Sequence, residues 1–539
     1  GNYGSATRSL APSINPNIGF STGWDQFDPY YLSIDSFRYY SQDVPVVKIK
    51  YSQANQEDTY LTLQFGRSFA KGWSLSLAYN RINQGDRIAY HFENQRQKNT
   101  ALGLGIWHNS PNGKYDAFYN YISNTAISED NGGVSDPDSI GVILTPNSVV
   151  PVFITQGMTS HKHRSFTTKQ IIHLISDTTE IGIDLWMKGQ FTTGLFKYVD
   201  PEPSGSLDYY GDFLVDERGI RQFTNLNEYQ FSGGFSLPWR VAHSTIQSSL
   251  RYRSINLQQE PIQRTINELY LDASGSFQLV EPLELKGQMS LGLGNANGAF
   301  LFKAEGSLNT GILGKLKGYW SIATRNPYMV ESSLYVNKQI IYNVDLENPF
   351  TTEFGVGWNW EKQNLNANIR WLIFDNYIYF DTAHMPTQIG ESFSLRRFSL
   401  SKDFDFKWIG LKGNVIWQPD VREEVAIPEL IYTAGLYGRV KVFKRKLTVM
   451  PGLDINYHDG YNGISYFPVN GRFHITNDMD IPDYFRIDAA IGIHINFLKI
   501  FVRIEDVAGF WKDRVLYEAD YYPHYPSYLR IGAETSFFN

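Results

Sequence analysis

The sequence predicts an all-β fold, a transmembrane antiparallel up-and-down β-barrel of about 22 strands, within a range of about 18 to 24. Three observations lead to this prediction. From Val46 to Phe538, segments of about ten to fourteen residues alternate apolar and polar side chains, as strands with two different faces do. Helical periodicity is almost absent. Very short connections broadly alternate with long ones, which is typical of outer-membrane barrels.

The first element is an arm, residues 1–44, that precedes the strands. It is rich in Asn, Pro, Ser and Tyr and shows no alternation. We expect a pre-barrel arm that is periplasmic or plug-like, and it is too short to form the globular plug of a TonB-dependent transporter. Residues 45–539 are then the outer-membrane β-barrel.

The strands follow in order, each with one apolar and one polar face. Four segments show the alternation most clearly: 73–80, 283–293, 485–496 and 529–537. They are as long as a tilted bilayer crossing requires, about 9–11 residues, whereas strands of soluble sheets average about 5–6. Short connections are expected at 69–72, 109–113, 280–282, 361–364, 443–446 and 497–499, and long loops at 125–162, 199–222, 326–344, 459–483 and 509–526. An even strand number places both chain ends in the periplasm.

Composition excludes several other classes of protein. The 539 residues contain no cysteine, so disulfide scaffolds and thiolate metal sites are impossible. Aromatic residues make up 15%, too many for a disordered chain. Lys and Arg number 48 against 55 Asp and Glu, with no basic block, so nucleic acid is not an expected partner. No apolar run approaches the length of a membrane helix. No signal peptide is visible at Gly1, which fits either a cytosolic chain or a mature exported form.

The polar strand faces supply the candidate pore-lining residues. A charge facing lipid costs several kcal/mol, so these faces must point into a wet or self-paired interior. They either form an electrostatic ladder that selects solutes by charge, or neutralise one another across neighbouring strands. The candidates are Arg251, Arg253, Glu268, Asp272, Glu284, Lys286, Lys317, Arg439, Lys441, Arg486, Asp488, Arg530 and Glu534.

Metal binding is weighed at two places, and no resident metal or cofactor is expected. His161 and His163 share one side of a strand, as a zinc site requires, but the cations beside them oppose binding and no third ligand is near. Acidic loops offer the oxygen ligands that calcium prefers, without the spacing of an EF-hand. Solvated loop charge is the default interpretation of these calcium candidates, which are Asp136, Asp138, Asp478 and Asp480.

No catalytic motif is present, and we expect the protein not to be an enzyme. The sequence lacks a Gly-x-Ser-x-Gly elbow, a P-loop and a His-Glu-x-x-His motif. A membrane-barrel hydrolase assembles its Ser, His and Asp from separate strands, and such a site is recognised by geometry rather than by a local pattern.

Short stretches at the start, the middle and the end of the chain resemble the putative porin family of the Bacteroidota. They are Gly1, Asn2, Tyr3, Gly4, Ser5 and Ala6; Asn131, Gly132, Gly133 and Val134; and Tyr521, Tyr522, Pro523 and Pro526 leading to Tyr528, Leu529, Arg530, Ile531, Gly532, Phe537 and Phe538. The resemblance implies an outer-membrane β-barrel of a Gram-negative bacterium and supplies no catalytic or substrate residues. The chain departs from the general barrel pattern by ending on Asn539 instead of an aromatic residue.

Two functions are expected from these observations. The first is a porin-like channel in the outer membrane for passive diffusion of small hydrophilic solutes, narrowed by folded-in loops such as 125–162. The alternative is a non-conducting barrel that serves as scaffold or accessory subunit of a larger outer-membrane complex, with further outer-membrane or periplasmic proteins as partners. A soluble carbohydrate-active β protein is the weakest interpretation. Outer-membrane lipid is an expected partner of either barrel.

Overall fold

The computed structural model describes residues 3–54, 58–85, 91–92, 94–136, 149–175, 182–203, 207–211, 215–239, 243–443, 447–510, 516–524 and 527–538. Within these ranges, none of the helices has the length and apolar character that a membrane-spanning helix needs. Asp138 lies outside the described residues.

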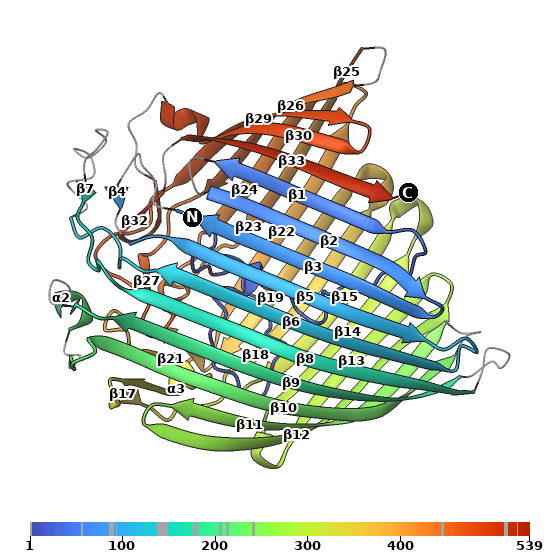
Figure 1. The fold of residues 1–539 in the computed structure, drawn as a ribbon, viewed down its shortest axis with the longest axis horizontal. Coiled ribbons are helices and arrows are strands. Elements are labelled where there is room, and N and C mark those ends of the chain that lie inside the picture. The colour runs from blue at the N-terminus through green and yellow to red at the C-terminus, as the bar shows by residue number, and fades with distance from the viewer. Residues whose placement is uncertain are drawn as a thin grey trace.

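The fold is a closed antiparallel barrel of 22 strands, which confirms the predicted class and strand number. Each strand pairs with its neighbours in chain order, and β1 closes the barrel by pairing with β33 (Figure 1). One barrel strand is interrupted: β24 and β25 both pair with β26 and count as one. The barrel strands are β1 (Val46–Ala54), β2 (Asp58–Ala70), β3 (Trp73–Gln84), β5 (Gln97–Asn109), β6 (Tyr115–Glu129), β8 (Met158–Ile175), β9 (Ile183–Asp200), β10 (Ile220–Trp239), β11 (Ser244–Gln259), β12 (Ile262–Val280), β13 (Leu283–Leu293), β14 (Phe300–Asn309), β15 (Lys315–Thr324), β18 (Phe350–Trp360), β19 (Leu365–Asp375), β22 (Phe393–Asp405), β23 (Ile409–Trp417), β24 (Leu430–Gly438) with β25 (Val440–Val442), β26 (Leu447–His458), β29 (Tyr484–Ile495), β30 (Leu498–Glu505) and β33 (Tyr528–Phe538).

The two ends of the barrel differ. At the turn end, adjacent strands are joined by tight connections, and both the start of β1 and the end of β33 lie there, since Val46 pairs with Phe538. Asn364 and Asn496 adopt the left-handed backbone in two of these turns, with φ of 47° and 50°, a conformation that asparagine tolerates well. General barrel architecture assigns this end to the periplasm.

The loop end carries the long connections, which contain short elements of their own. Figure 1 shows α2, β4, β7 and β17 gathered at this end, opposite the C-terminus. These elements are β4 (His91–Phe92), β7 (Val149–Val150), α2 (Leu207–Tyr210), α3 (Met329–Ser332), β16 (Ser333–Val336), β17 (Gln339–Asn343), β20 (Tyr377–Phe380), β21 (Pro386–Ile389), β27 (Ile464–Phe467), β28 (Arg472–Ile475), β31 (Tyr517–Ala519) and β32 (Tyr522–Pro523).

The alternation of side chains sorts the wall into a lipid face and a lumen face. On β11, Leu250 and Tyr252 point outward and are 51% and 41% exposed, whereas Arg251 and Arg253 point into the lumen and pair with carboxylates there. Strands β8 to β12 run for 16 to 20 residues, longer than a bilayer crossing needs. We attribute the extra length to wall that extends beyond the membrane at the loop end.

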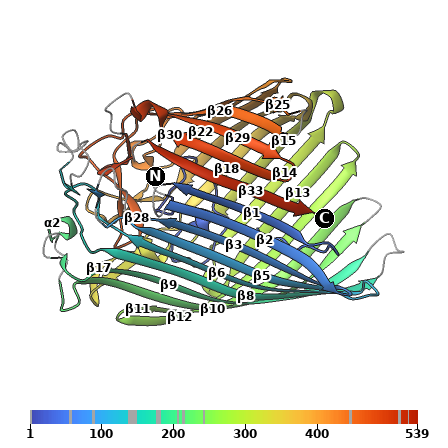
Figure 2. The ribbon, with the colours of Figure 1, turned by 45° about the horizontal axis from the view of Figure 1, so that its top comes forward.

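The described part of the arm, residues 3–44, lies inside the barrel and contacts its wall at widely separated strands. Asn99 of β5 donates to the carbonyl of Gly4 at 2.8 Å, and Arg397 of β22 donates to the carbonyl of Pro12 at 2.8 Å. In Figure 2 the N-terminus lies among the strands and loops near the loop end. The arm then descends along β6, β5 and β3 to the turn end, where β1 begins.

Candidate functional site

An apolar core occupies part of the loop end of the lumen. It joins side chains from the arm, the barrel wall and the loops, and Trp24 of the arm lies within it. The Trp24 ring stacks on Phe196 of β9 at 4.2 Å between centroids, and its Nε1 donates to the carbonyl of Asn470 at 2.9 Å. Loop residues Val330 and Phe467 are completely buried in the same core. The arm is therefore an integral part of the structure that covers the barrel at this end.

A buried ion-pair network holds the arm to β10, β11 and β12. Arg253 donates to Glu228 at 2.8 Å and to Glu268 at 2.9 Å, and Arg253 and Glu268 are only 7% and 2% exposed. The backbone of Phe20 completes the network, because its N–H donates to Glu268 at 2.8 Å and its carbonyl accepts from Arg253 at 3.3 Å. Charges this far from water are stable only when paired. Here the charged groups of the wall pair with one another and with the backbone of the arm.

Lumen-facing glycines leave room for aromatic side chains of the arm. A Cβ atom added at Gly105 of β5 would lie 2.3 Å from the Phe37 ring, and one added at Gly103 would lie 2.7 Å from it. Tyr40 occupies the corresponding space above Gly66 of β2, where a Cβ atom would come within 2.4 Å. These glycines let the backbone of the wall approach the arm closely.

Ile14 anchors the middle of the arm to the wall at β14 and β15. Its side chain is 7% exposed and belongs to a buried cluster that includes Ile18, Leu301 of β14 and Ala323 of β15. Nearby, Gln418 donates to the carbonyl of Leu10 at 3.0 Å. Apolar contact and hydrogen bonds to backbone carbonyls thus fix residues 10–14 across the lumen.

Two polar cavities lie on either side of this anchor. The turn-side cavity has a volume of about 710 Å³ and is lined by lumen-facing residues of β11 to β19. The loop-side cavity has a volume of about 850 Å³ and lies among the arm, the ends of β15, β18 and β19, and the loops. Ser13 and Ile14 line both cavities. The arm crosses the space between them at these two residues.

The structure places the predicted pore-lining residues in ion pairs. Twelve of the thirteen have a partner among the described residues; the exception, Lys441, lies on β25 at the turn end, next to Arg439. The pairs are Arg251–Asp272 (2.8 Å), Arg253–Glu268 (2.9 Å), Lys286–Glu284 (2.9 Å), Lys317–Glu305 (3.4 Å), Arg439–Asp405 (3.4 Å), Arg486–Asp488 (2.7 Å), Arg530–Glu505 (2.9 Å) and Lys499–Glu534 (3.2 Å). That these residues line a conducting pore stays a prediction.

Sequence reasoning missed several charged residues of the turn-side cavity. Lys303, Glu305, Glu353 and Arg370 line it together with the predicted Lys286 and Lys317. The alternation from 300 to 309 and from 365 to 375 carried the signal for three of them, because Lys303, Glu305 and Arg370 each lie between two outward apolar or small residues. Glu353 lies between Thr352 and Phe354 in the strand 350–360. Only the pairing of β14, β15, β18 and β19 brings them to one wall.

No group of three or more metal-ligating side chains occurs in the part of the chain that the structure describes. Asp478 accepts a hydrogen bond from the Tyr521 hydroxyl at 2.6 Å, and Asp480 is exposed. His161 lies within hydrogen-bond distance of the Tyr31 hydroxyl, at 3.0 Å, and packs among aromatic rings. Asp136 is exposed as well. Calcium binding at Asp136, Asp478 and Asp480 and zinc binding at His161 stay hypotheses.

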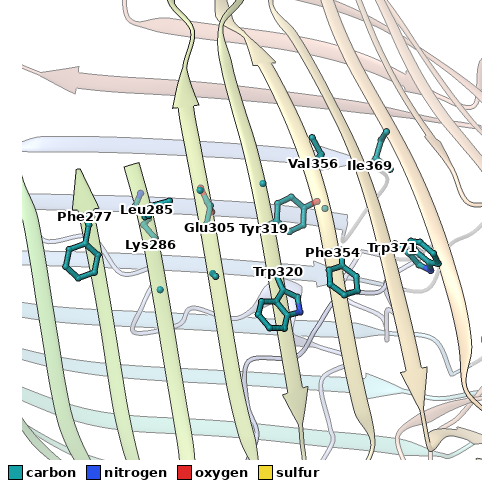
Figure 3. A pocket seen from close by; sticks show the side chains of 15 residues that line it. Phe277, Leu285, Lys286, Glu305, Tyr319, Trp320, Phe354, Val356, Ile369 and Trp371 are labelled. Carbon is teal, nitrogen blue, oxygen red and sulfur yellow. The ribbon is translucent and has the colours of Figure 1, made fainter. Parts of the chain in front are cut away.

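A separate hollow of about 750 Å³ opens on the lipid face over β12 to β19. Figure 3 shows Trp320, Phe354 and Trp371 around it. Small residues thin the wall at its centre, since Gly287 pairs with Ala304 and Gly306 pairs with Gly318. This hollow faces the membrane, so it lies outside the lumen even though the turn-side cavity is directly behind it.

Two histidines in the loop-end cover predict a pH dependence. The His384 ring stacks on Phe467 at 3.9 Å and meets His474 edge-on at 4.2 Å. Burial lowers the pKa of His384 to about 4, against a smaller opposing effect of Asp381, and burial together with His384 lowers the pKa of His474 to about 3. The neutral rings thus stabilise the folded loops above pH 6.5, and this stability is lost as the pH falls from about 6.5 toward 4.

We expect amide hydrogen exchange in β20, β21, β27 and β28 to become about tenfold faster at pH 5 than at pH 7.5, after correction for intrinsic rates. The His384→Phe variant keeps the stacked ring and removes one titrating group, so its pH dependence should be weaker. An equal pH dependence in that variant would contradict this assignment.

Comparison with known proteins adds a family and a fold. A family model described as "Putative porin" matches residues 1–539. No curated protein matches the sequence.

Three solved structures share the barrel, all at low sequence identity. The copper transporter OprC has a TM-score of 0.67 at 10% identity, over 93% of this chain and 81% of its own. A ferric enterobactin receptor (PfeA) mutant from Pseudomonas aeruginosa has 0.64 at 10%, over 93% and 81%. The FrpB iron transporter from Neisseria meningitidis has 0.63 at 11%, over 92% and 81%. These likenesses show the fold alone.

Proposed function

The chain belongs to the family described as Putative porin, and from this premise we propose that it is a channel for passive diffusion of small hydrophilic solutes, constricted by its own arm. Its barrel is an integral outer-membrane structure. A barrel of 22 strands encloses more space than wall side chains fill. The arm and the loops occupy part of that space, and the polar cavities are the rest. The proposed role is non-catalytic.

One observation carries the proposal: the two polar cavities follow the same stretch of wall and meet at Ser13 and Ile14. On β15 the lining runs from Lys317, Tyr319 and Ser321 in the turn-side cavity to Ala323 in the loop-side cavity. This continuity supports a solute route along β15, β18 and β19. The anchor at Ile14 is the narrow point of that route.

Passage along this route needs no energy source. A solute exchanges its hydration shell for hydroxyl, amide and charged groups of the lumen face. It crosses the anchor when residues 12–16 move away from the wall by local unfolding. The Ile14 contact is small compared with the core around Trp24, so we expect the anchor to open while the rest of the arm stays in place. The arm thereby sets both the width of the solute route and the frequency with which the route opens.

The absence of native cysteine permits a direct test. In the Ile14→Cys/Ala323→Cys variant, the two thiols would lie in one buried cluster, and an oxidised pair would lock the anchor. In planar bilayers we expect conductance steps from the wild-type chain, larger or longer steps from Ile14→Ser, and loss of steps in the oxidised double variant that reductant restores. The Ile14→Cys single variant is the control.

Two results would contradict the proposal. One is a silent bilayer for both the wild-type chain and Ile14→Ser. The other is a locked variant, with its cross-link verified by mass spectrometry, that conducts like the wild-type chain.

A scaffold role is the second candidate, and the apolar cover of the loop end favours it. A barrel that is covered at one end presents its loops as a stable surface, as an accessory subunit of a larger complex requires. Partners that co-purify in mild detergent at a fixed ratio, together with a silent bilayer, would support this role over the channel.

A further inference from the structure

The charges of the turn-side cavity are unbalanced. Four cationic side chains line it, from Lys286, Lys303, Lys317 and Arg370, against the two carboxylates of Glu305 and Glu353. Arg370 pairs with Glu353 at 3.0 Å, and Lys317 pairs with Glu305 at 3.4 Å. Both carboxylates are therefore already engaged by cations of the same wall.

This pairing leaves two cations, Lys286 and Lys303, and Lys286 pairs with Glu284 on its own strand at 2.9 Å. Lys303 lies on β14 between Phe302 and Ala304, which face outward, and within the described ranges no carboxylate lies within ion-pair distance of it. Its neighbour across the sheet on β13 is the neutral Gln288. Its charge is thus available to a solute in the cavity.

Arg397, next to the arm, is a second cation with no carboxylate within ion-pair distance among the described residues. It is 6% exposed, and its guanidinium donates to the side-chain oxygen of Gln418 at 2.7 Å and to the carbonyl of Pro12 at 2.8 Å. In the sheet it pairs with Arg370. Neutral acceptors do not cancel its charge, so the wall stays positive up to the narrow point of the route.

The neutral lining of the cavity also offers hydrogen-bond donors. Ser274, Ser321 and Asn368 contribute hydroxyl and amide groups. The Tyr319 hydroxyl is buried and forms no hydrogen bond with the described residues. Donors and cations together suit the oxygen atoms of a carboxylate, phosphate or sulfate group.

From this geometry we infer that the turn-side cavity is a selectivity site for small anionic solutes that carry carboxylate, phosphate or sulfate groups. The inference rests on the proposed channel function and names its substrate class. Charged side chains that line a pore select permeant ions of the opposite sign. Cations in the cavity meet a net positive wall.

The test measures the reversal potential of the full chain in a planar bilayer under a tenfold KCl gradient, for the wild-type chain and for Ile14→Ser. We expect anion selectivity, and a fall of the chloride-to-potassium permeability ratio on the order of threefold in Lys303→Glu, with a smaller fall in Lys303→Gln. Lys188→Glu is the matched control, because Lys188 faces the lumen from β9 and does not line this cavity. Inorganic phosphate should reduce the chloride current in the wild-type chain more than in Lys303→Glu.

The outcomes separate the two proposals. No current from either chain overturns the channel function itself. Current with cation selectivity overturns only the anion inference. Equal shifts in Lys303→Glu and Lys188→Glu, or equal block by phosphate in the wild-type chain and Lys303→Glu, overturn the assignment of selectivity to this cavity.

Discussion

Replacing Arg253 with methionine is expected to destabilise the barrel by about 3–5 kcal/mol, because it leaves buried carboxylates without their partner. Glu268 is 2% exposed, and Arg253 joins it to Glu228 and to the backbone of Phe20. The free energy of unfolding, from urea titrations of the barrel in lipid vesicles, measures the loss. We also expect protease to cleave the arm near Phe20 faster in the variant.

Arg251→Met is the matched control, two residues away on the same strand. Arg251 pairs with Asp272 at 2.8 Å, but both side chains are about a quarter exposed, at 25% and 28%. Water solvates the Asp272 carboxylate that remains, so we expect the free energy of unfolding to fall by only about 1 kcal/mol. If both variants lost the same free energy of unfolding, burial of the Arg253 network would make no additional contribution to stability.

Replacing Gly105 with leucine is expected to displace Phe37 and with it the descending part of the arm. Even a single added carbon would lie 2.3 Å from the Phe37 ring, so the side chain and the ring exclude each other. We expect a loss of about 1–3 kcal/mol, as in other overpacked sites, and faster proteolysis of residues 32–42. Limited proteolysis with mass spectrometry locates the cleavage, and urea titration measures the loss.

A second substitution identifies the cause of this effect. Phe37→Ala in the Gly105→Leu background removes the ring that the leucine meets, so part of the lost stability should return. Gly318→Ala is the control for adding a side chain to a barrel glycine, because a Cβ atom there meets nothing within 4 Å. If Phe37→Ala lowers stability further by its full single-variant effect, the two residues do not compete for the same space.

The barrel itself was predictable because its rules are local. Alternation over segments such as 283–293 determines which side chains face lipid, and tight turns such as 361–364 determine where the chain reverses. Each barrel strand pairs with the strands before and after it, so counting them in order gave the right number. The interruption between β24 and β25 did not disturb the count, because both segments pair with β26.

The interior was not predictable in the same way, because its contacts join residues far apart in the sequence. Arg397 meets Pro12, and Trp24 meets Asn470, and no periodicity relates the members of either pair. In the sequence, the glycines at 66, 103 and 105 are residues that weaken a strand. In the structure, they leave the space that aromatic side chains of the arm occupy. The two meanings cannot be separated without the position of the arm.

The seam between β1 and β33 has a consequence for the order of assembly. Its nine residue pairs, from Val46 with Phe538 to Ala54 with Arg530, join opposite ends of the barrel sequence, so this closure has the largest loop entropy of any strand pairing in the wall. The neighbouring hairpins form locally and earlier. The arm is covalently attached to the first strand of the seam and contacts strands as far apart as β5 and β22, so these contacts can exist together only when the sheet has curled. We therefore expect docking of the arm and closure of the seam to be coupled.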